Sequence, residues 1–214
     1  MRYNEFKNQV RGYPVITASL LGGLGENERT LRNQLSRWQK QKLIVQLKKG
    51  LYLLNREDRA LHPSFFFLAN QMAYPSYVSL ESALAYYQMI PETVYQVTSV
   101  TTAKPVQHVS AEGVFTFRHV QPALFFGFKT IRDERGFEVL IAEPEKALLD
   151  FIYLNPLQFP RDDAEVFAQS YRLSAEGILH RRRLMDYAAR FSSKKLQRVA
   201  QLFVKTYLSE GVHA

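Results

Sequence analysis

The amino-acid sequence predicts an α+β protein in two parts, a small N-terminal domain over residues 1–56 and a larger mixed α+β domain over residues 61–214. The first observation is a helical periodicity over residues 28–40 that runs directly into a short hairpin. The second is the polar, aperiodic stretch 55–60, after which the composition changes sharply. Of the 15 phenylalanines in the chain, only Phe6 precedes this stretch. We therefore expect the larger part to have an aromatic-rich core of its own.

The N-terminal part is expected to contain three helices followed by a hairpin. The predicted elements are helices over residues 2–12, 17–21 and 28–40 and strands over residues 44–47 and 51–54. Asn27 can cap the third helix through its side-chain oxygen. Gly50, after Lys48 and Lys49, can adopt the positive φ that a tight turn often needs. This order of elements is the plan of a winged helix-turn-helix domain, in which the third helix enters the major groove of DNA.

The third helix separates an apolar stripe from a basic face when its residues are placed 100° apart. Leu31, Leu35 and Trp38 fall on one narrow arc. The opposite side has no acidic residue between Arg29 and Lys40. One face can therefore pack against the protein, and the other is free to meet phosphates and base edges.

The candidate DNA contacts lie on this basic face and at the tip of the hairpin. Arginine and asparagine form bidentate hydrogen bonds with guanine and adenine, whereas phosphate contacts position a protein without reading sequence. The expected base contacts are Arg32, Asn33 and Ser36. The expected phosphate contacts are Arg29, Arg37, Lys40, Lys48 and Lys49. Thr30 completes the predicted DNA-binding set.

The distribution of charge supports a polyanionic partner for the N-terminal part. The chain has a net charge of +8. Residues 1–56 contain 11 Lys and Arg against 3 Asp and Glu, and residues 57–214 contain 17 of each kind. The whole excess thus lies beside the third helix, which favours binding of double-stranded DNA.

A second basic cluster lies near the C-terminus. Its members are Arg181, Arg182, Arg183, Lys194, Lys195 and Arg198. They could extend the DNA footprint, or meet RNA or an acidic partner. The interpretation we favour is a solvated face on amphipathic helices, because the second part is neutral as a whole.

The larger part is predicted to combine a small sheet with surrounding helices. The expected helices cover residues 61–73, 80–89, 144–154, 174–191 and 193–208. The expected strands cover residues 94–102, 113–120, 124–131 and 136–141. Ser79 is a candidate N-cap, and Pro144 suits the first turn of a helix because the missing N–H costs nothing there.

Signals for catalysis are weak, and we expect neither an enzyme nor a bound metal or cofactor. The histidines show no ligand spacing; they are His62, His108, His119, His180 and His213. One acidic group near Lys146 could suggest a metal-dependent nuclease, namely Glu138, Glu143, Glu145 and Asp150. Adjacent Glu145 and Lys146 should point to different sides, however, and acids at a helix start are favoured by the helix dipole. A nucleic-acid-processing enzyme and a ligand-sensing regulator with an aromatic pocket remain alternatives.

The sequence also indicates a cytoplasmic protein that does not enter a membrane. Cysteine is absent, which excludes disulfides and thiolate zinc sites. Residues 1–6 lack the apolar region of a signal peptide, and no stretch of about 18 uncharged apolar residues is present.

Several sequence blocks resemble one family of regulators. Residues 35–38 and 47–52 resemble the N-terminal domain of the AbiEi-type antitoxins, which are winged-helix transcriptional regulators of viral-defence loci. The similarity continues to about residue 155, and its specific parts are Ser-Leu-Glu-Ser-Ala-Leu at 79–84 and Pro-Glu-Lys-Ala-Leu-Leu-Asp at 144–150. Weaker similarity lies at 90–92 and 98–102.

This resemblance implies a repressor that is also an antitoxin. The N-terminal domain would bind inverted repeats in the promoter of its own operon. The second domain would counter a nucleotidyltransferase toxin encoded alongside, without a stable toxin–antitoxin complex.

Overall fold

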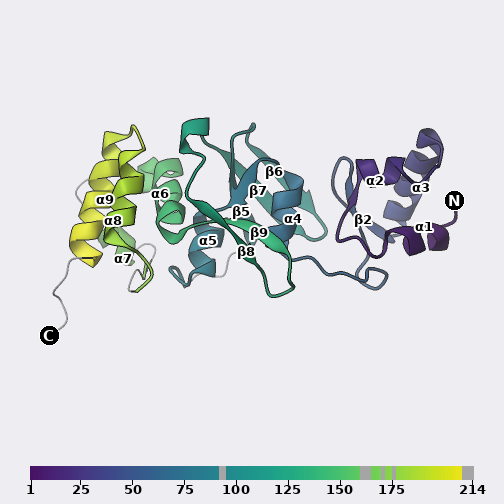
Figure 1. The fold of residues 1–214 in the computed structure, drawn as a ribbon, viewed down its shortest axis with the longest axis horizontal. Helices are drawn as coiled ribbons and strands as arrows, with labels where there is room; N and C mark the ends of the chain where they lie inside the picture. Colours follow the sequence, from purple (N-terminus) through teal and green to yellow (C-terminus); the bar gives the residue numbers. More distant parts are fainter. Residues whose placement is uncertain (92–94, 160–164, 170–171, 175–176, 209–214) are drawn as a thin grey trace.

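The computed structural model describes residues 1–91, 95–159, 165–169, 172–174 and 177–208. Within these residues it confirms the α+β class, with a three-stranded antiparallel sheet and a six-stranded mixed sheet. The elements follow one long axis, with the N-terminal helices at one end and the last two helices at the other (Figure 1). No helix of the described residues is both long and apolar enough to cross a membrane.

The N-terminal part contains three helices and three strands. The helices are α1 (Tyr3–Val10), α2 (Ala18–Gly22) and α3 (Glu28–Lys40). The strands are β1 (Ile16–Thr17), β2 (Ile44–Lys48) and β3 (Leu51–Leu54), in the order β1-β3-β2. The expected cap is confirmed, since Asn27 Oδ1 accepts hydrogen bonds from the N–H groups of Arg29 and Thr30 at 3.0 and 3.3 Å. Gly50 has the positive φ of +78° that the turn requires.

Both faces of the hairpin formed by β2 and β3 are buried. Successive side chains of a strand point to opposite faces, so neighbouring hairpin residues join different cores. Ile44 and Leu54 face the helices and join a core with Trp38 and other residues of the N-terminal part. Leu51 and Leu53 face the opposite way and join the larger core of the second part. The boundary between residues 56 and 61 therefore stays a prediction, since the hairpin contributes to both cores.

The larger sheet has the strand order β6-β7-β5-β4-β9-β8. Its strands are β4 (Ser76–Val78), β5 (Gln96–Thr101), β6 (Val106–Ser110), β7 (Gly113–His119), β8 (Phe128–Arg132) and β9 (Glu138–Ala142). The pairs β5–β7 and β4–β9 are parallel, and the other pairs are antiparallel. The mixed pairing brings β4 to the centre of the sheet.

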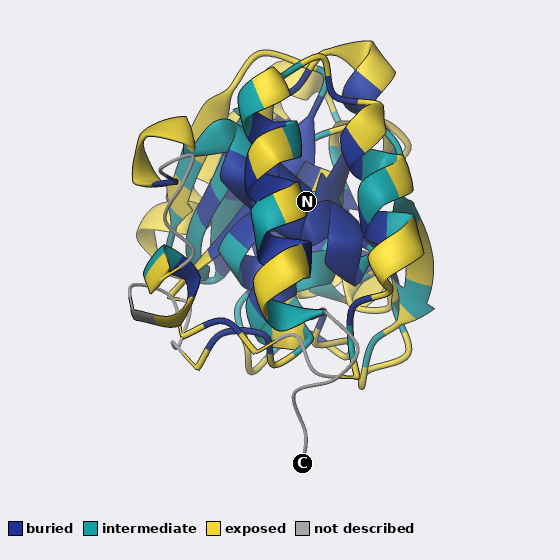
Figure 2. Ribbon diagram, turned by 90° about the vertical axis from the view of Figure 1, so that its left-hand side faces the viewer, coloured by how far each residue is buried: buried dark blue, intermediate teal, exposed yellow. Residues whose placement is uncertain are grey.

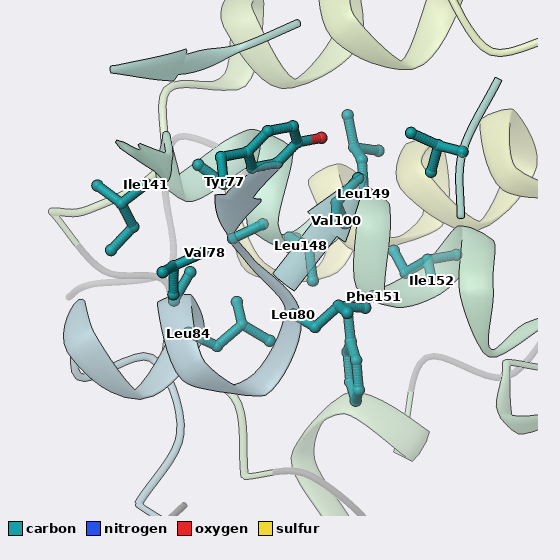
Figure 3. Packing of buried hydrophobic residues seen from close by; sticks show 14 of the residues in the cluster. Tyr77, Val78, Leu80, Leu84, Val100, Ile141, Leu148, Leu149, Phe151 and Ile152 are labelled. Carbon is teal, nitrogen blue, oxygen red and sulfur yellow. The ribbon is translucent and has the colours of Figure 1, made fainter. Parts of the chain in front are cut away.

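Six helices accompany this sheet among the described residues. They are α4 (Phe65–Met72), α5 (Leu80–Tyr86), α6 (Pro144–Leu154), α7 (Glu165–Gln169), α8 (Arg181–Ala189) and α9 (Lys194–Tyr207). Tyr77 and Val78 of β4 lie among buried side chains of α5 and α6, including Leu148 and Leu149 (Figure 3). Seen from the α8–α9 end, the helices carry exposed residues outside and buried residues towards the centre (Figure 2).

Several predicted boundaries were wrong for local reasons. The helix expected from residue 61 begins only at Phe65, because Ser64 caps it by accepting a hydrogen bond from Phe67 N–H at 3.1 Å. The strand expected from Leu124 starts at Phe128, after a 3₁₀ turn opened by Pro122. The helix expected from residue 174 begins at Arg181. Val94 and residues 175–176, included in these predictions, lie outside the described residues, as does His213.

Candidate nucleic-acid interface

Helix α3 is anchored by the apolar stripe that its sequence predicts. Leu31, Leu35 and Trp38 retain only 6%, 7% and 1% of their exposure. The Trp38 ring stacks on Phe6 of α1 with ring centroids 4.7 Å apart, and the edge of Tyr3 meets it at 5.5 Å. Aromatic pairs of this kind add to the free energy of burial. The orientation of α3 is thus fixed by contacts that leave its basic side untouched.

The opposite side of α3 is exposed, as predicted. Seven of the nine candidate residues lie there, and all seven are exposed: Arg29, Thr30, Arg32, Asn33, Ser36, Arg37 and Lys40. Within the described part of the chain, only one of these side chains has an ionic partner. Arg32 Nη2 lies 2.6 Å from Glu28 Oε1, one helical turn earlier. Both side chains are largely exposed, at 74% and 87%, and such surface pairs are weak enough for a phosphate to replace.

The two lysines of the hairpin tip differ in their surroundings. Lys49 is exposed, whereas Lys48 is half-buried and lies opposite Leu51, next to a bulge in β2. Burial lowers the pKa of His108 in β6, and the nearby charge of Lys48 lowers it further. Figure 1 shows β2 between the N-terminal helices and the larger sheet. The two lysines were expected to act alike, but the structure leaves Lys49 as the freer cation.

The second basic cluster lies at the other end of the molecule, on α8 and α9 (Figure 1). Some of its cations have internal partners. Arg183 Nη1 lies 3.7 Å from Glu143 Oε1 and 3.6 Å from Glu145 Oε2, and Lys195 donates to the carbonyl of Pro156. Arg181, Lys194 and Arg198 are exposed. This cluster and α3 therefore form two separate basic surfaces.

Three of the four acids near Lys146 make internal polar contacts, namely Glu143, Glu145 and Asp150, whereas Glu138 lies exposed on β9. Asp150 accepts hydrogen bonds from the Tyr77 hydroxyl at 2.9 Å and from Ser79 Oγ at 2.8 Å. It also forms an ion pair with Lys146, and both of these side chains are fully buried. Burial raises the pKa of Asp150 and lowers that of Lys146, and their mutual contact opposes both shifts. Ser79 was expected to cap α5, but its hydroxyl donates to Asp150 instead.

The neighbouring glutamates tie α6 to α8. Glu145, also fully buried, accepts a hydrogen bond from the His180 N–H at 2.8 Å. Glu143 accepts one from the Tyr187 hydroxyl. The helix dipole alone was thus an incomplete explanation for these acids. The described residues contain no group of three or more His, Asp or Glu placed to hold a metal ion.

The two most specific blocks of the sequence meet in the polar network around Asp150. Ser79 opens the first block, and Lys146 and Asp150 belong to the second. A lysine and an aspartate four residues apart in an otherwise apolar helix share one face, and this spacing was the available signal for a buried pair. The network joins the central strand to α6, so these blocks have a structural role.

Comparisons with known proteins do not assign the chain. No known protein family matches it. No curated protein matches it either.

Proposed function

We propose that the protein is a sequence-specific DNA-binding transcriptional repressor. Its N-terminal part would act as a winged helix-turn-helix domain with α3 as the recognition helix. The observation that carries the proposal is the exposed face of α3, whose cations and amide are almost free of internal partners beside a basic hairpin tip. Residues 1–56 carry a net charge of +8, so this segment would attract DNA electrostatically.

The proposed contacts follow from the position of each side chain. Arg32, Asn33 and Ser36 would read base edges in the major groove. The other cations of this face and of the hairpin tip would hold phosphates, with Thr30 near the start of the helix. Those cations are Arg29, Arg37, Lys40 and Lys49. Lys48 would contribute less, since it is half-buried.

The resemblance to AbiEi-type antitoxins supports a further role for the second part. In this proposal the protein binds inverted repeats in the promoter of its own operon, and the second part counters a nucleotidyltransferase toxin without a stable complex. The protein itself would not be an enzyme. Because the specific blocks form a buried network, the resemblance concerns the fold of this part more than a partner-binding surface.

DNA binding can be tested with promoter fragments upstream of the gene. We expect the full chain to prefer this DNA to a scrambled duplex in gel-shift titrations. Arg32→Ala combined with Arg37→Ala should weaken binding by about 100-fold, since a base contact contributes about 1–3 kcal/mol. Arg181→Ala combined with Arg182→Ala, an equal loss of charge, should change the affinity less than about threefold. Equal effects of the two double variants would refute the assignment of α3.

The antitoxin role needs a separate experiment. Expression of a neighbouring nucleotidyltransferase-like gene should arrest growth, and co-expression of this protein should relieve the arrest. The Arg32→Ala, Arg37→Ala variant should still relieve it, because the second part is unchanged. Failure of the wild-type protein to relieve the arrest would reduce the proposal to a lone regulator.

A further inference from the structure

An open groove of about 660 Å³ lies where the N-terminal part joins the larger part. We call it the junction groove. Its walls come from residues 55–64, which we call the connecting segment, from α4 and α5, and from the turns β6–β7 and β8–β9. Its volume falls within the range of about 300–1,000 Å³ that is usual for small-molecule sites.

The connecting segment is fixed on both sides of the groove. Towards the N-terminal part, Asp58 accepts hydrogen bonds from the Tyr3 hydroxyl at 2.7 Å and from Lys7 Nζ at 2.9 Å. Towards the larger part, buried Arg59 donates from Nη2 to Glu112 Oε1 at 2.6 Å. Arg135 Nη1 donates to the carbonyl of His62 at 2.7 Å. The segment predicted as a plain linker is therefore held in place, and the groove is part of the folded structure.

Two arginines in the groove remain accessible among the described residues. Arg132 is exposed and forms no ion pair there, and Arg56 is 73% exposed, with its Nη2 3.7 Å from Glu112 Oε2 in a long ion pair. Some of the acids nearby are engaged by the protein. Glu112 is paired with Arg59, and Asp133 Oδ1 accepts two backbone hydrogen bonds in the β8–β9 turn, while its buried Oδ2 has no hydrogen-bond partner among the described residues. Glu134 and Glu138, the latter opposite Arg132 across β8 and β9, are exposed. The available hydrogen-bond donors thus suit an anion, since arginine binds phosphate bidentately.

The groove also exposes aromatic surface beside these arginines. The side chains of Phe65 and Tyr86 are each 47% exposed, so both rings are accessible from the groove. The ring of Tyr86 is supported by Phe66, with centroids 6.1 Å apart. Flat rings held in this way can stack on a planar base.

We propose that the junction groove binds a nucleotide, with its phosphates on Arg56 and Arg132 and its base against Phe65 or Tyr86. The occupant would touch both the connecting segment and the larger part. It could therefore act as an effector that changes how the N-terminal part engages DNA. The binding step goes beyond the proposed repressor function and does not depend on it.

The test is calorimetric titration of the full chain with ATP, GTP, CTP, UTP and inorganic tripolyphosphate as probes. We expect at least one nucleotide to bind with a Kd below about 100 µM. Arg56→Ala with Arg132→Ala should weaken nucleotide and tripolyphosphate by about tenfold or more. Tyr86→Ala with Phe65→Ala should weaken the nucleotide alone, because only the stacking surface is lost.

Control variants keep the result independent of the DNA site. Arg32→Ala with Arg37→Ala should leave nucleotide affinity unchanged, and circular dichroism melting should show that each groove variant remains folded. Absence of binding up to about 1 mM of every nucleotide would overturn the proposal. A nucleotide affinity that the groove variants leave unchanged would overturn it as well. A ten-nucleotide oligothymidylate that binds more tightly than any single nucleotide, and equally depends on Arg132, would identify the occupant as single-stranded nucleic acid. That result would also overturn the proposal.

Discussion

Helix α3 and the pair α8–α9 are both basic and amphipathic, yet they use their cations differently. Residues 181–207 hold eight Lys and Arg against one acid, a net charge of +7 that is close to the +8 of residues 1–56. The intervening residues 57–180 hold 9 Lys and Arg against 15 Asp and Glu, a net charge of −6. The neutrality of the second part thus conceals an acidic middle and a basic end. Charge alone does not distinguish the two basic ends.

The partners of the cations do distinguish them. On α3 the one ion pair, between Arg32 and Glu28, is exposed. On α8, Arg183 reaches the buried carboxylate of Glu145, and Tyr187 donates to Glu143. Part of the α8 surface therefore holds the helix against α6, whereas the α3 face is not needed for folding. A free basic face is the stronger indication of an external anion.

The largest expected difference concerns folding. Lys146→Met would leave Asp150 as an unpaired buried charge beneath the C-terminal helices, and the free energy of unfolding should fall by about 3–5 kcal/mol. Arg32→Met on α3 should change it by less than about 0.5 kcal/mol, because the side chain is exposed. Urea unfolding of both variants measures this contrast. Similar losses would show that α3 is also bound to the fold by its cations.

The salt dependence of DNA binding should differ next. Arg29→Ala with Arg37→Ala should reduce the slope of log affinity against log salt by about 2, since each lost phosphate contact releases about one counterion fewer. Arg181→Ala with Arg182→Ala should leave the slope unchanged. Anisotropy titrations at several salt concentrations provide the slopes. A smaller slope for the α8 variant would mean that both ends hold DNA.

The smallest expected effect appears at alkaline pH. Burial and the hydrogen bond to Glu143 raise the pKa of Tyr187 to about 12. Since this pKa lies above the value of about 10 in the unfolded chain, the stabilisation is complete below pH 10 and is lost as the pH rises through 12. Tyr187→Phe should therefore flatten the decline of unfolding free energy between pH 10 and 12. Tyr13→Phe, an exposed control, should leave that decline as it is.

The sequence predicted features that depend on neighbours in the chain. The stripe of α3, the cap at Asn27 and the turn at Gly50 each follow from residues within a few positions. Strands β4 and β6 were missed because one has three residues and the other lies mostly exposed at a sheet edge. The partner against which each helix or strand packs depends on residues that are distant in the sequence.

Contacts between distant residues could not be derived in this way. Arg59 and Glu112 are 53 positions apart, and Ser79 and Asp150 are 71 apart. No local pattern shows that the hairpin packs against the larger part or that a groove forms beside it. The exposure of the α3 candidates could therefore be predicted from the sequence, whereas the junction groove required the fold.

The absence of cysteine permits a direct test of which end meets DNA. Gln39→Cys on α3 and Ser192→Cys between α8 and α9 each offer one exposed thiol for an iron–EDTA group, and neither residue is a proposed DNA contact. The label on residue 39 should cleave the promoter within the protected half-sites, and the label on residue 192 should not cleave it. Cleavage from residue 192 without cleavage from residue 39 would contradict the assignment of α3 as the DNA-reading helix.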